Sequence, residues 1–520
     1  MSLRKRYLFG MISGAGSVVI KTGLNIVLIP VMIAHLGLDA FGFYILLISI
    51  LEISMLLDFG ATGALVKLLG GEQTDSLTRR DYLKVGHSLF ALLAGLFLIL
   101  GLLLAPGFPD MFRITSALMP VAQTAFLLTV LEATLTIYSC YYRSVLLAHC
   151  AHQWTNVADT LYATVANLGA LLLLLAGLDL PAVLGIRLLS AVLRLVLMMA
   201  QSLKLEKFAF FPGVPLRKKT CTEVLRLGFH AMMINFSIII SHKIDDLVIA
   251  RFLPISAVGI YEIVFRFLGI IIQICLKLSE GSFPLFARMA KENRRDDARQ
   301  LFLRMSGLLN FVAAISLMLI LSYYPELFHL FSAGRIPIEQ TLPVLVLAVP
   351  VILSGVLQMP ASNWLFTWGH QKMLTVSSVA TALSNLVLSV LLVQSMGIAG
   401  VALGTLIPQL IQHQAVLIRK TCQWLQISLK EYLGSVHMGV LIPVGLAFLW
   451  VQLCKPLATG MPLPLISMAL VAATALVLGS GLWFWLTATT LEREMFVVKL
   501  LNPAKLKLKS KFTTGNATHG

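Results

Sequence analysis

The stretch SLFALLAGLFLILGLLLA, residues 88–105, carries no charged side chain and is long enough to cross the hydrocarbon core of a bilayer as one helix. It follows the charged segment RRDYLK, residues 79–84. The same alternation of long apolar runs and charged segments recurs along all 520 residues. Because 58% of the residues are hydrophobic and only 12% are charged, a soluble globule could not bury this much apolar surface. The sequence therefore predicts an all-α integral membrane protein.

Apolar runs of this kind predict fourteen transmembrane helices of about 20 residues or more. The first run is too long for a signal peptide and lacks a small-residue cleavage site, so we expect it to stay in the membrane. The predicted helices lie near residues 8–34, 40–65, 84–105, 117–142, 156–178, 181–203, 227–250, 255–278, 302–322, 341–365, 374–395, 398–418, 432–454 and 463–489.

Lysine and arginine are distributed unevenly between the segments that separate these runs. If the N-terminus is cytoplasmic, the inner segments hold thirty of the 40 basic residues, and the outer loops hold only Arg113, Arg251, Arg335 and Lys455. Because basic residues accumulate in cytoplasmic loops, this distribution predicts a multi-pass protein with both termini in the cytoplasm. The net charge of +16 then serves topology and binding to anionic lipid, and we expect no nucleic-acid partner.

Two parts of the chain resemble each other at a nearly constant spacing. IAHLGLDAFGFY (33–44) is similar to IARFLPISAVGIY (249–261), which pairs Gly42 with Gly259 at a spacing of 217. The pairs Asn167 with Asn385 and Gly185 with Gly404 give 218 and 219. We therefore expect two homologous six-helix bundles around a central cavity, followed by two further helices. The expected regions are 1–205 and 227–420 for the two bundles, 206–226 for a basic linker, 421–490 for the extra helices and 491–520 for a basic tail.

The segments outside the apolar runs are too short to hold a separate catalytic domain. They contain no P-loop, no Ser/His/Asp set on a plausible scaffold and no clustered carboxylates that would bind a sugar donor with its metal. The 6 cysteines and 11 histidines are scattered without metal-ligand spacing. The sequence predicts a protein that moves a substrate and is not an enzyme, with no cofactor and no metal site.

Polar residues inside the apolar runs indicate the transport path, because a charge at the bilayer centre costs about 2.5–3.5 kcal/mol and usually faces water or a partner. Several of them recur every three or four residues, on one face of a helix. The predicted substrate-binding lining is cationic and consists of Lys21, Asn25, Arg187, Arg194, Arg266 and Lys277. The membrane acids that are candidates for coupling to an ion are Glu52, Asp58 and Glu132.

These residues also have structural interpretations. Lys277 and Arg187 lie near the ends of their runs, from which long side chains can reach the interface. Glu262 and Arg266 form an i,i+4 pair that could neutralise itself. The three membrane acids are equally suited to be structural partners of buried bases. A local ion-pair network or a substrate contact would both explain the cluster of Lys243, Asp245 and Asp246.

Five motifs are similar to one known family of membrane proteins. They are HLGLDAFGFY (35–44), LLDFGATGALVKLLG (56–70), DDLVIARFLPISAVGIY (245–261), SNWLFTWGHQKMLTV (362–376) and GIAGVALGTLI (397–407). They resemble the first two helices, the start of the second half and the tenth to twelfth helices of bacterial polysaccharide flippases, the Wzx-like proteins. The resemblance covers about residues 8–420 and extends to the whole multidrug, oligosaccharidyl-lipid and polysaccharide exporter superfamily.

The resemblance implies a protein of the bacterial inner membrane with a V-shaped cavity that opens alternately to each side. Its expected cargo is an undecaprenyl-diphosphate-linked oligosaccharide, such as an O-antigen unit of lipopolysaccharide. Lys21, Arg194 and Arg266 would hold the diphosphate, because fixed positive charge must replace its hydration. Membrane lipid, H⁺ or Na⁺, and polysaccharide polymerase or chain-length proteins are the other implied partners.

Two further functions remain open from the sequence. A cation-coupled drug antiporter of the same superfamily would be expected to carry an acid in its first helix, where this chain has Lys21. A membrane-embedded polysaccharide polymerase or ligase would be expected to carry a sizeable outer loop with catalytic Arg or His residues. The short outer loops make that function the least favoured.

Overall fold

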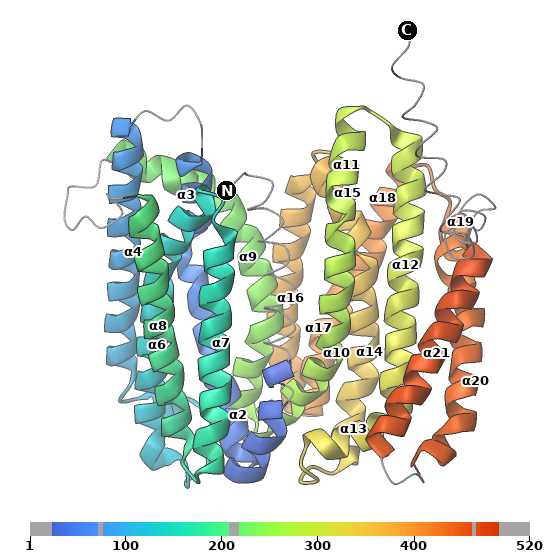
Figure 1. Cartoon of the computed structure of the whole chain (residues 1–520), viewed down its shortest axis with the longest axis horizontal. Coiled ribbons are helices and arrows are strands. Elements are labelled where there is room, and N and C mark those ends of the chain that lie inside the picture. Colours follow the sequence, from blue (N-terminus) through green and yellow to red (C-terminus); the bar gives the residue numbers. More distant parts are fainter. Residues whose placement is uncertain (1–22, 26, 71–75, 207–217, 460–463, 488–520) are drawn as a thin grey trace, which may run out of the picture. The chain divides into compact units, whose positions relative to one another are not determined.

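The computed structural model describes residues 23–25, 27–70, 76–206, 218–459 and 464–487, and all regular elements of this part of the chain are helices (Figure 1). The prediction of an all-α protein is therefore confirmed. The α-helices are α2 Leu38–Ser54, α3 Ala61–Leu69, α4 Ser76–Leu104, α5 Phe108–Met111, α6 Met119–Ala148, α7 His152–Leu175, α8 Leu180–Leu205, α9 Lys218–Phe252, α10 Ser256–Glu280, α11 Ser282–Lys291, α12 Arg295–Ser322, α13 Tyr324–Phe331, α14 Leu342–Leu357, α15 Met359–Thr367, α16 Gln371–Met396, α17 Ile398–Leu410, α18 Arg419–Trp424, α19 Leu429–Leu433, α20 Gly439–Thr459 and α21 Pro464–Thr487.

Among the described residues, 12 helices are long and apolar enough to cross a membrane, and each coincides with one of the fourteen predicted runs. The chain is thus a multi-pass membrane protein. The predicted first run lies mostly outside the described residues, apart from the short apolar helix Gly23–Leu36. The predicted seventh run, 227–250, is helical as part of α9, which carries three charged residues at 243–246 and is not among the 12.

The second predicted run, 40–65, is not one continuous helix. It forms α2, a 3₁₀ turn at Met55–Asp58 and then α3. Phe59 and Gly60 join the last two elements in the left-handed region, at φ 47° and 71°. A side chain at Gly60 would also be excluded by space, because its Cβ would lie 2.1 Å from the carbonyl oxygen of Gly228 in α9. Hydropathy did not predict this break, since left-handed residues leave the apolar character of a run unchanged.

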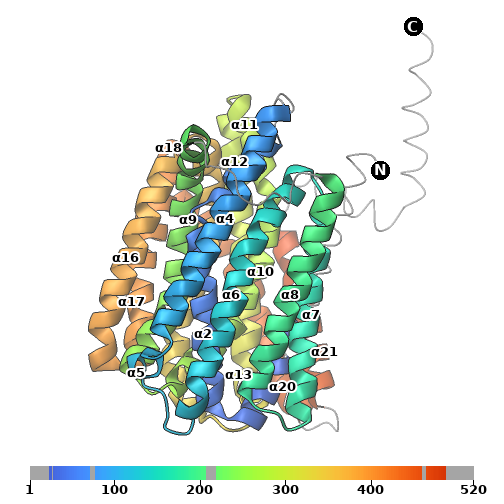
Figure 2. The ribbon, with the colours of Figure 1, turned by 90° about the vertical axis from the view of Figure 1, so that its left-hand side faces the viewer.

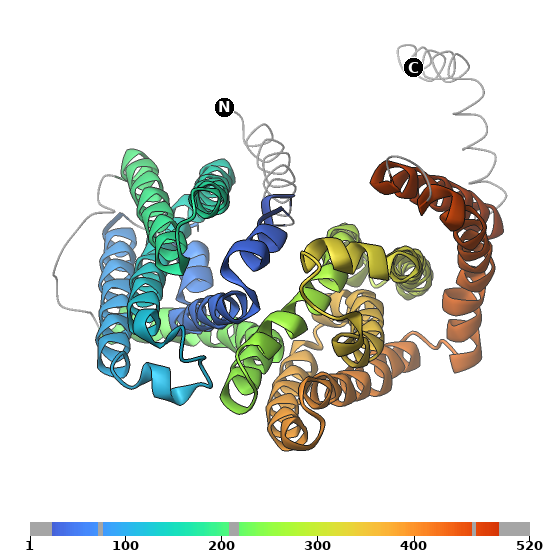
Figure 3. The same ribbon diagram turned by 90° about the horizontal axis from the view of Figure 1, so that it is seen from below.

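The described residues belong to two compact units. The first takes its residues from 1–269, 325–354 and 370–416, and the second from 270–324, 355–369 and 417–520. In the first unit α6 packs against α4 and α8, α8 against α7, and α16 against α9 and α17 (Figure 2). In the second unit α20 packs against α12 and α21 (Figure 3). The division into homologous bundles at residues 205 and 420 stays a prediction.

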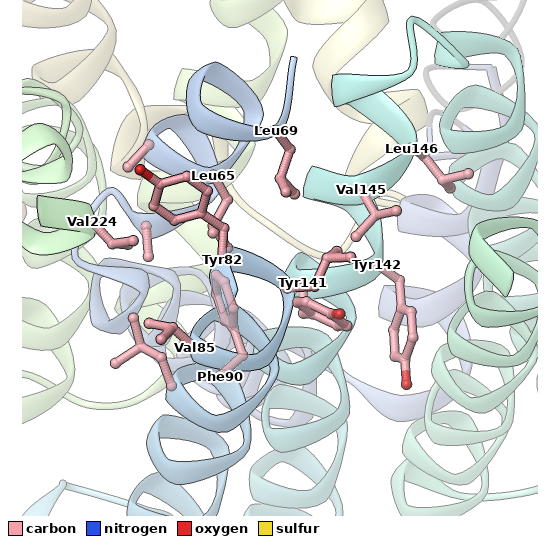
Figure 4. Close-up of a cluster of buried hydrophobic side chains, with 14 of the residues drawn as sticks. Leu65, Leu69, Tyr82, Val85, Phe90, Tyr141, Tyr142, Val145, Leu146 and Val224 are labelled. Atoms are coloured by element: carbon pink, nitrogen blue, oxygen red, sulfur yellow. The ribbon is translucent and has the colours of Figure 1, made fainter. Parts of the chain in front are cut away.

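Large side chains fill the space between the first helices of the first unit. Tyr141 and Tyr142 of α6 are fully buried and belong to one cluster with Phe90 of α4, Leu65 of α3 and Val224 of α9 (Figure 4). The two tyrosine rings meet edge to face with centroids 5.0 Å apart. Because lipid chains are as apolar as these side chains, close van der Waals packing must hold the helices together.

Two glycines allow α2 to pass close to the start of α10. A Cβ on Gly42 would lie 2.1 Å from the carbonyl oxygen of Ile255, and one on Gly259 would lie 3.0 Å from Cδ1 of Phe41. Small residues at such crossings let two helix backbones approach in a membrane. These are the two glycines that the sequence repeat pairs, so the two similar motifs contact each other directly.

Candidate functional site

A buried ion pair lies among four helices of the first unit, and we call it the Arg187 cluster. Arg187 of α8 donates to Glu132 of α6, with Nη2 2.9 Å from Oε1 and Nε 3.2 Å from Oε2. Its other donors reach the hydroxyl oxygens of Tyr44 of α2 at 3.1 Å and Tyr162 of α7 at 2.8 Å. Glu132 also accepts a hydrogen bond from Tyr162. The charges of Arg187 and Glu132 therefore neutralise each other inside the cluster. This agrees with a structural role for both residues.

Arg194 lies two turns further along α8 and is in a different situation. It is 8% exposed. Its Nη2 donates to the hydroxyl of Thr136 at 2.5 Å, and its guanidinium lies 4.3 Å from the ring centroid of Tyr162. Its Nε has no hydrogen-bond partner, and no carboxylate in the described part of the chain forms an ion pair with it. A buried cation without a counter-charge is costly, so this guanidinium has unused capacity for an anion.

A second group of charges connects α2, α9 and α10, and we call it the Lys243 chain. Lys243 Nζ lies 3.2 Å from Glu52, 3.9 Å from Glu262 and 4.0 Å from Asp246. Glu262 in turn pairs with Arg266, whose Nη2 lies 2.6 Å from Oε1. The predicted i,i+4 pair is therefore present. Glu52 and Arg266, the first and last residues of this series of charges, are its more accessible members, with side chains 45% and 32% exposed.

Asp245 does not join its neighbour Asp246 in this chain. Its Oδ2 accepts hydrogen bonds from the hydroxyls of Tyr261 and Thr405, each at 2.7 Å. Its Oδ1 is buried without a hydrogen-bond partner. The Asn385 Oδ1 atom is close by, because it accepts from Ser389 Oγ at 2.8 Å and is 3.4 Å from the Thr405 hydroxyl. We call this group the Asp245 cluster.

The Asp245 cluster is rich in oxygen atoms of the kind that bind hard cations. Carboxylate, hydroxyl and amide oxygens are typical ligands of such ions. The described residues contain no group of three or more His, Cys, Asp and Glu side chains with the geometry of a metal site. One carboxylate surrounded by neutral oxygens matches the charge of a monovalent ion.

The Asp245 cluster is not evident from the sequence alone. There Asp245 stands in a cluster with Lys243 and Asp246, Asn385 marks the internal repeat, and Ser389 has no assigned role. The signal that was available is the presence of Asn385 and Ser389 four residues apart, on one face of an apolar helix.

The remaining predicted site residues lie elsewhere. Lys21 lies outside the described residues. Asn25 is half-buried in the short helix that precedes α2. Lys277 is exposed and pairs with Glu280 at 2.8 Å. Asp58 accepts the backbone N–H of Gly60 at 2.6 Å, so it stabilises the turn before α3.

The family of the chain follows from comparison with known proteins. The profile described as polysaccharide biosynthesis protein matches residues 8–290, more than half of the sequence. The chain belongs to this family. The profile described as MatE matches a shorter segment, residues 231–391. A comparison with curated protein sequences gives no match.

Solved structures show which fold this family member has. The lipid II flippase MurJ in an inward closed conformation is similar with a TM-score of 0.70 and 14% identity, over 91% of this chain and 99% of that one. An inward-facing multidrug resistance MATE family transporter of the MOP superfamily gives 0.63 and 13%, over 78% and 95%. The MATE multidrug transporter DinF-BH in complex with R6G gives 0.59 and 16%, over 82% and 96%. The predicted fold of two helical bundles with further helices is therefore confirmed.

Proposed function

We propose that this chain carries an undecaprenyl-diphosphate-linked oligosaccharide across the bacterial inner membrane by alternating access, with both termini in the cytoplasm. The observation that carries the proposal is that a member of the polysaccharide biosynthesis family shares the fold of a lipid flippase over 91% of its length. The MATE transporters match a smaller share, 78–82%. The flippase comparison covers 99% of that protein, and in this chain the two helices α20 and α21 follow the predicted bundles. These helices are candidates for a surface that accommodates the polyprenyl tail.

The chemistry of the cargo requires fixed positive charge, because a diphosphate cannot enter a low-dielectric space without it. Arg187, Arg266 and Lys277 pair with acids in the structure, so each would have to exchange a carboxylate for the cargo phosphate. Arg194 has no carboxylate to displace among the described residues. We therefore give Arg194 the leading role in phosphate binding, with Lys21 and Asn25 of the first predicted helix as its proposed companions.

We propose that Asp245 is the residue through which transport is coupled to an ion. Of the three acids proposed from the sequence, Glu132 is neutralised by Arg187 and Asp58 caps a turn. Glu52 is accessible but pairs with Lys243. Asp245 differs because its free oxygen lies next to neutral oxygen ligands. A bound sodium ion or proton there would satisfy the carboxylate and alter the packing of α9 against α17.

A drug or small-molecule antiporter is the second candidate function, and the match of residues 231–391 to the MatE profile favours it. The two functions differ in the charge required of the lumen. An antiporter that exports cations needs accessible acids, whereas a carrier of diphosphate-linked glycan needs accessible bases. Lys21 in the first predicted helix supports the flippase.

Deletion of the gene followed by lipid analysis tests the proposal. We expect a lipid-linked glycan to accumulate on the cytoplasmic face and surface glycan to be lost. In the complemented strain, Arg194→Ala should reduce export about tenfold to a hundredfold, since a charge-assisted contact contributes about 1.5–3 kcal/mol. Arg288→Ala, at an exposed arginine outside these clusters, is the matched control. Normal surface glycan in the deletion strain, without a second exporter, would refute the function.

A further inference from the structure

The second unit contains a pocket that the clusters above do not involve. It has a volume of about 380 Å³ and lies between the end of α10, the start of α11 and α15. Its polar groups come from Ser279, Glu280, Gln358 and Asn363, and the rest of its wall is apolar. Ligand pockets measure about 300–1,000 Å³ and combine an apolar wall with a few placed polar groups. This pocket is at the small end of that range, the size of one or two sugar rings.

The amide of Asn363 is held in one orientation. Its Nδ2 donates to the carbonyl oxygen of Ser279 at 3.1 Å, and it contacts the hydroxyls of Ser279 and Ser282 at 3.0 and 3.1 Å. A carbonyl oxygen can only accept, so the nitrogen of the amide must face it. Within the described residues no donor reaches the Oδ1 of Asn363. This oxygen remains an acceptor for a ligand in the pocket.

Two more polar groups are also fixed in place. Gln358 Oε1 accepts from the Ser362 hydroxyl, which leaves the two N–H donors of its Nε2 for other partners. Both carboxylate oxygens of Glu280 accept from Lys277 Nζ, at 2.8 and 3.0 Å. The carboxylate side chain is still 53% exposed and has lone pairs to spare. The pocket therefore presents donors and acceptors together, with an acid at its edge.

An accessible aromatic ring completes the pocket. Phe283 of α11 is 38% exposed, and its ring is tilted against that of Phe366, with centroids 5.7 Å apart. The contact restricts the ring without covering it. An exposed ring next to amide and carboxylate groups offers an apolar face to C–H groups and hydrogen bonds to neighbouring hydroxyls.

We propose that this pocket binds sugar rings of the transported glycan, which rests on the proposed function and adds a second binding region for the cargo. A pyranose has the matching chemistry, because its C–H face is apolar and its rim carries adjacent hydroxyls that both donate and accept. Glu280 is paired with Lys277, so the edge of the pocket offers no excess positive charge to the diphosphate group. The pocket thus selects neutral or amino sugars, while the diphosphate is held by bases elsewhere.

The test is direct binding of soluble disaccharides to the full-length protein in nanodiscs that contain no glycosidic detergent. The probes are cellobiose, lactose and N,N′-diacetylchitobiose, observed by saturation-transfer NMR and titrated for affinity. We expect at least one probe to bind the unmodified protein. Phe283→Ala and Asn363→Leu should each weaken that binding about fivefold to tenfold, the loss of a ring contact or a hydrogen bond.

Two exposed residues of the second unit provide matched controls. Phe448→Ala and Gln423→Leu remove the same groups outside the pocket and should leave binding unchanged. Thermal unfolding of each variant shows whether it has folded, and Phe283→Ala keeps the test decisive if Asn363→Leu destabilises the helix contacts. Absence of binding for all three sugars, or equal losses of affinity in the control variants, would refute the proposal that this pocket binds sugars.

Failure of the pocket and failure of the function are distinguishable. If the deletion strain accumulates lipid-linked glycan but the purified protein binds none of the sugars, the flippase stands and the pocket falls. If the sugars bind through Phe283 and Asn363 but the deletion leaves surface glycan unchanged, the pocket binds sugars, but the flippase function and the transported glycan as the ligand are both refuted.

Discussion

Tyr44 and Tyr261 occupy equivalent positions in the two similar motifs, yet their hydroxyls form hydrogen bonds with groups of opposite charge. Tyr44 accepts a hydrogen bond from Arg187, a cation that Glu132 neutralises. Tyr261 donates to Asp245, an anion without a basic partner among the described residues. In the Arg187 cluster the two charges are paired. In the Asp245 cluster, one oxygen of the carboxylate lacks a hydrogen-bond partner.

This difference separates structural from functional charges within a shared arrangement. A buried ion pair whose charges neutralise each other gains little stability from a further ligand, because the two partners already compensate the cost of desolvation. An incomplete cluster gains a great deal from an ion that supplies the missing contact. The comparison therefore assigns a structural role to the Arg187 cluster and an exchangeable role to the Asp245 cluster. The predictions that follow test this assignment.

The largest effect is expected from breaking the closed pair. Glu132→Gln leaves Arg187 buried without its counter-charge and should lower the free energy of unfolding by about 3–5 kcal/mol. Thermal unfolding of the purified protein in detergent measures the change. The double variant Glu132→Leu with Arg187→Met removes both charges and should recover most of the stability. A single variant as stable as the parent would show that the pair is not closed and buried.

The next effect concerns the incomplete cluster. Sodium chloride at ten times the dissociation constant should stabilise the protein by about 1.4 kcal/mol relative to choline chloride of equal ionic strength. Asp245→Asn should abolish this difference, because the amide carries no charge for the ion. Asp110→Asn, at an exposed acid, is the control and should respond to sodium like the parent. An unchanged sodium response in Asp245→Asn would place the ion elsewhere.

The paired glycines should respond unequally. Gly42→Ala would put Cβ 2.1 Å from a backbone oxygen, which cannot move alone, and should cost about 1–3 kcal/mol. Gly259→Ala meets side-chain atoms at 3.0 Å or more, and these can shift, so it should cost less than Gly42→Ala. Unfolding temperatures of the two variants give the order. A reversed order would contradict the close approach of α2 to the start of α10.

The smallest effect is expected for the two hydroxyls. Tyr261→Phe removes one of two donors to Asp245 and should cost about 1 kcal/mol, whereas Tyr44→Phe should cost less because Arg187 keeps Glu132 and Tyr162. Only Tyr261→Phe should also weaken the sodium response. Equal changes in that response would mean that the two clusters do not differ in function.

Much of the fold was predictable because a membrane places two simple requirements on each segment that crosses it. A helix must satisfy its own backbone, and a run of about 20 apolar residues is enough to place it. Twelve of the fourteen predicted runs are confirmed on this basis. The break at Phe59 and Gly60 was missed, because it depends on the close approach of Gly228 and not on hydropathy.

The sequence by itself determined that the chain is helical, that it spans the membrane many times and that charges persist inside the apolar runs. It also determined the i,i+4 pair of Glu262 with Arg266, because four residues along one helix bring two side chains together without any tertiary contact. Only the tertiary structure decided that Arg187 meets Glu132, that Asp245 faces Thr405 and that Arg194 meets no acid in the described chain. The physical reason is that each of these outcomes depends on which helices are neighbours and how they are rotated, and spacing along one helix does not specify either.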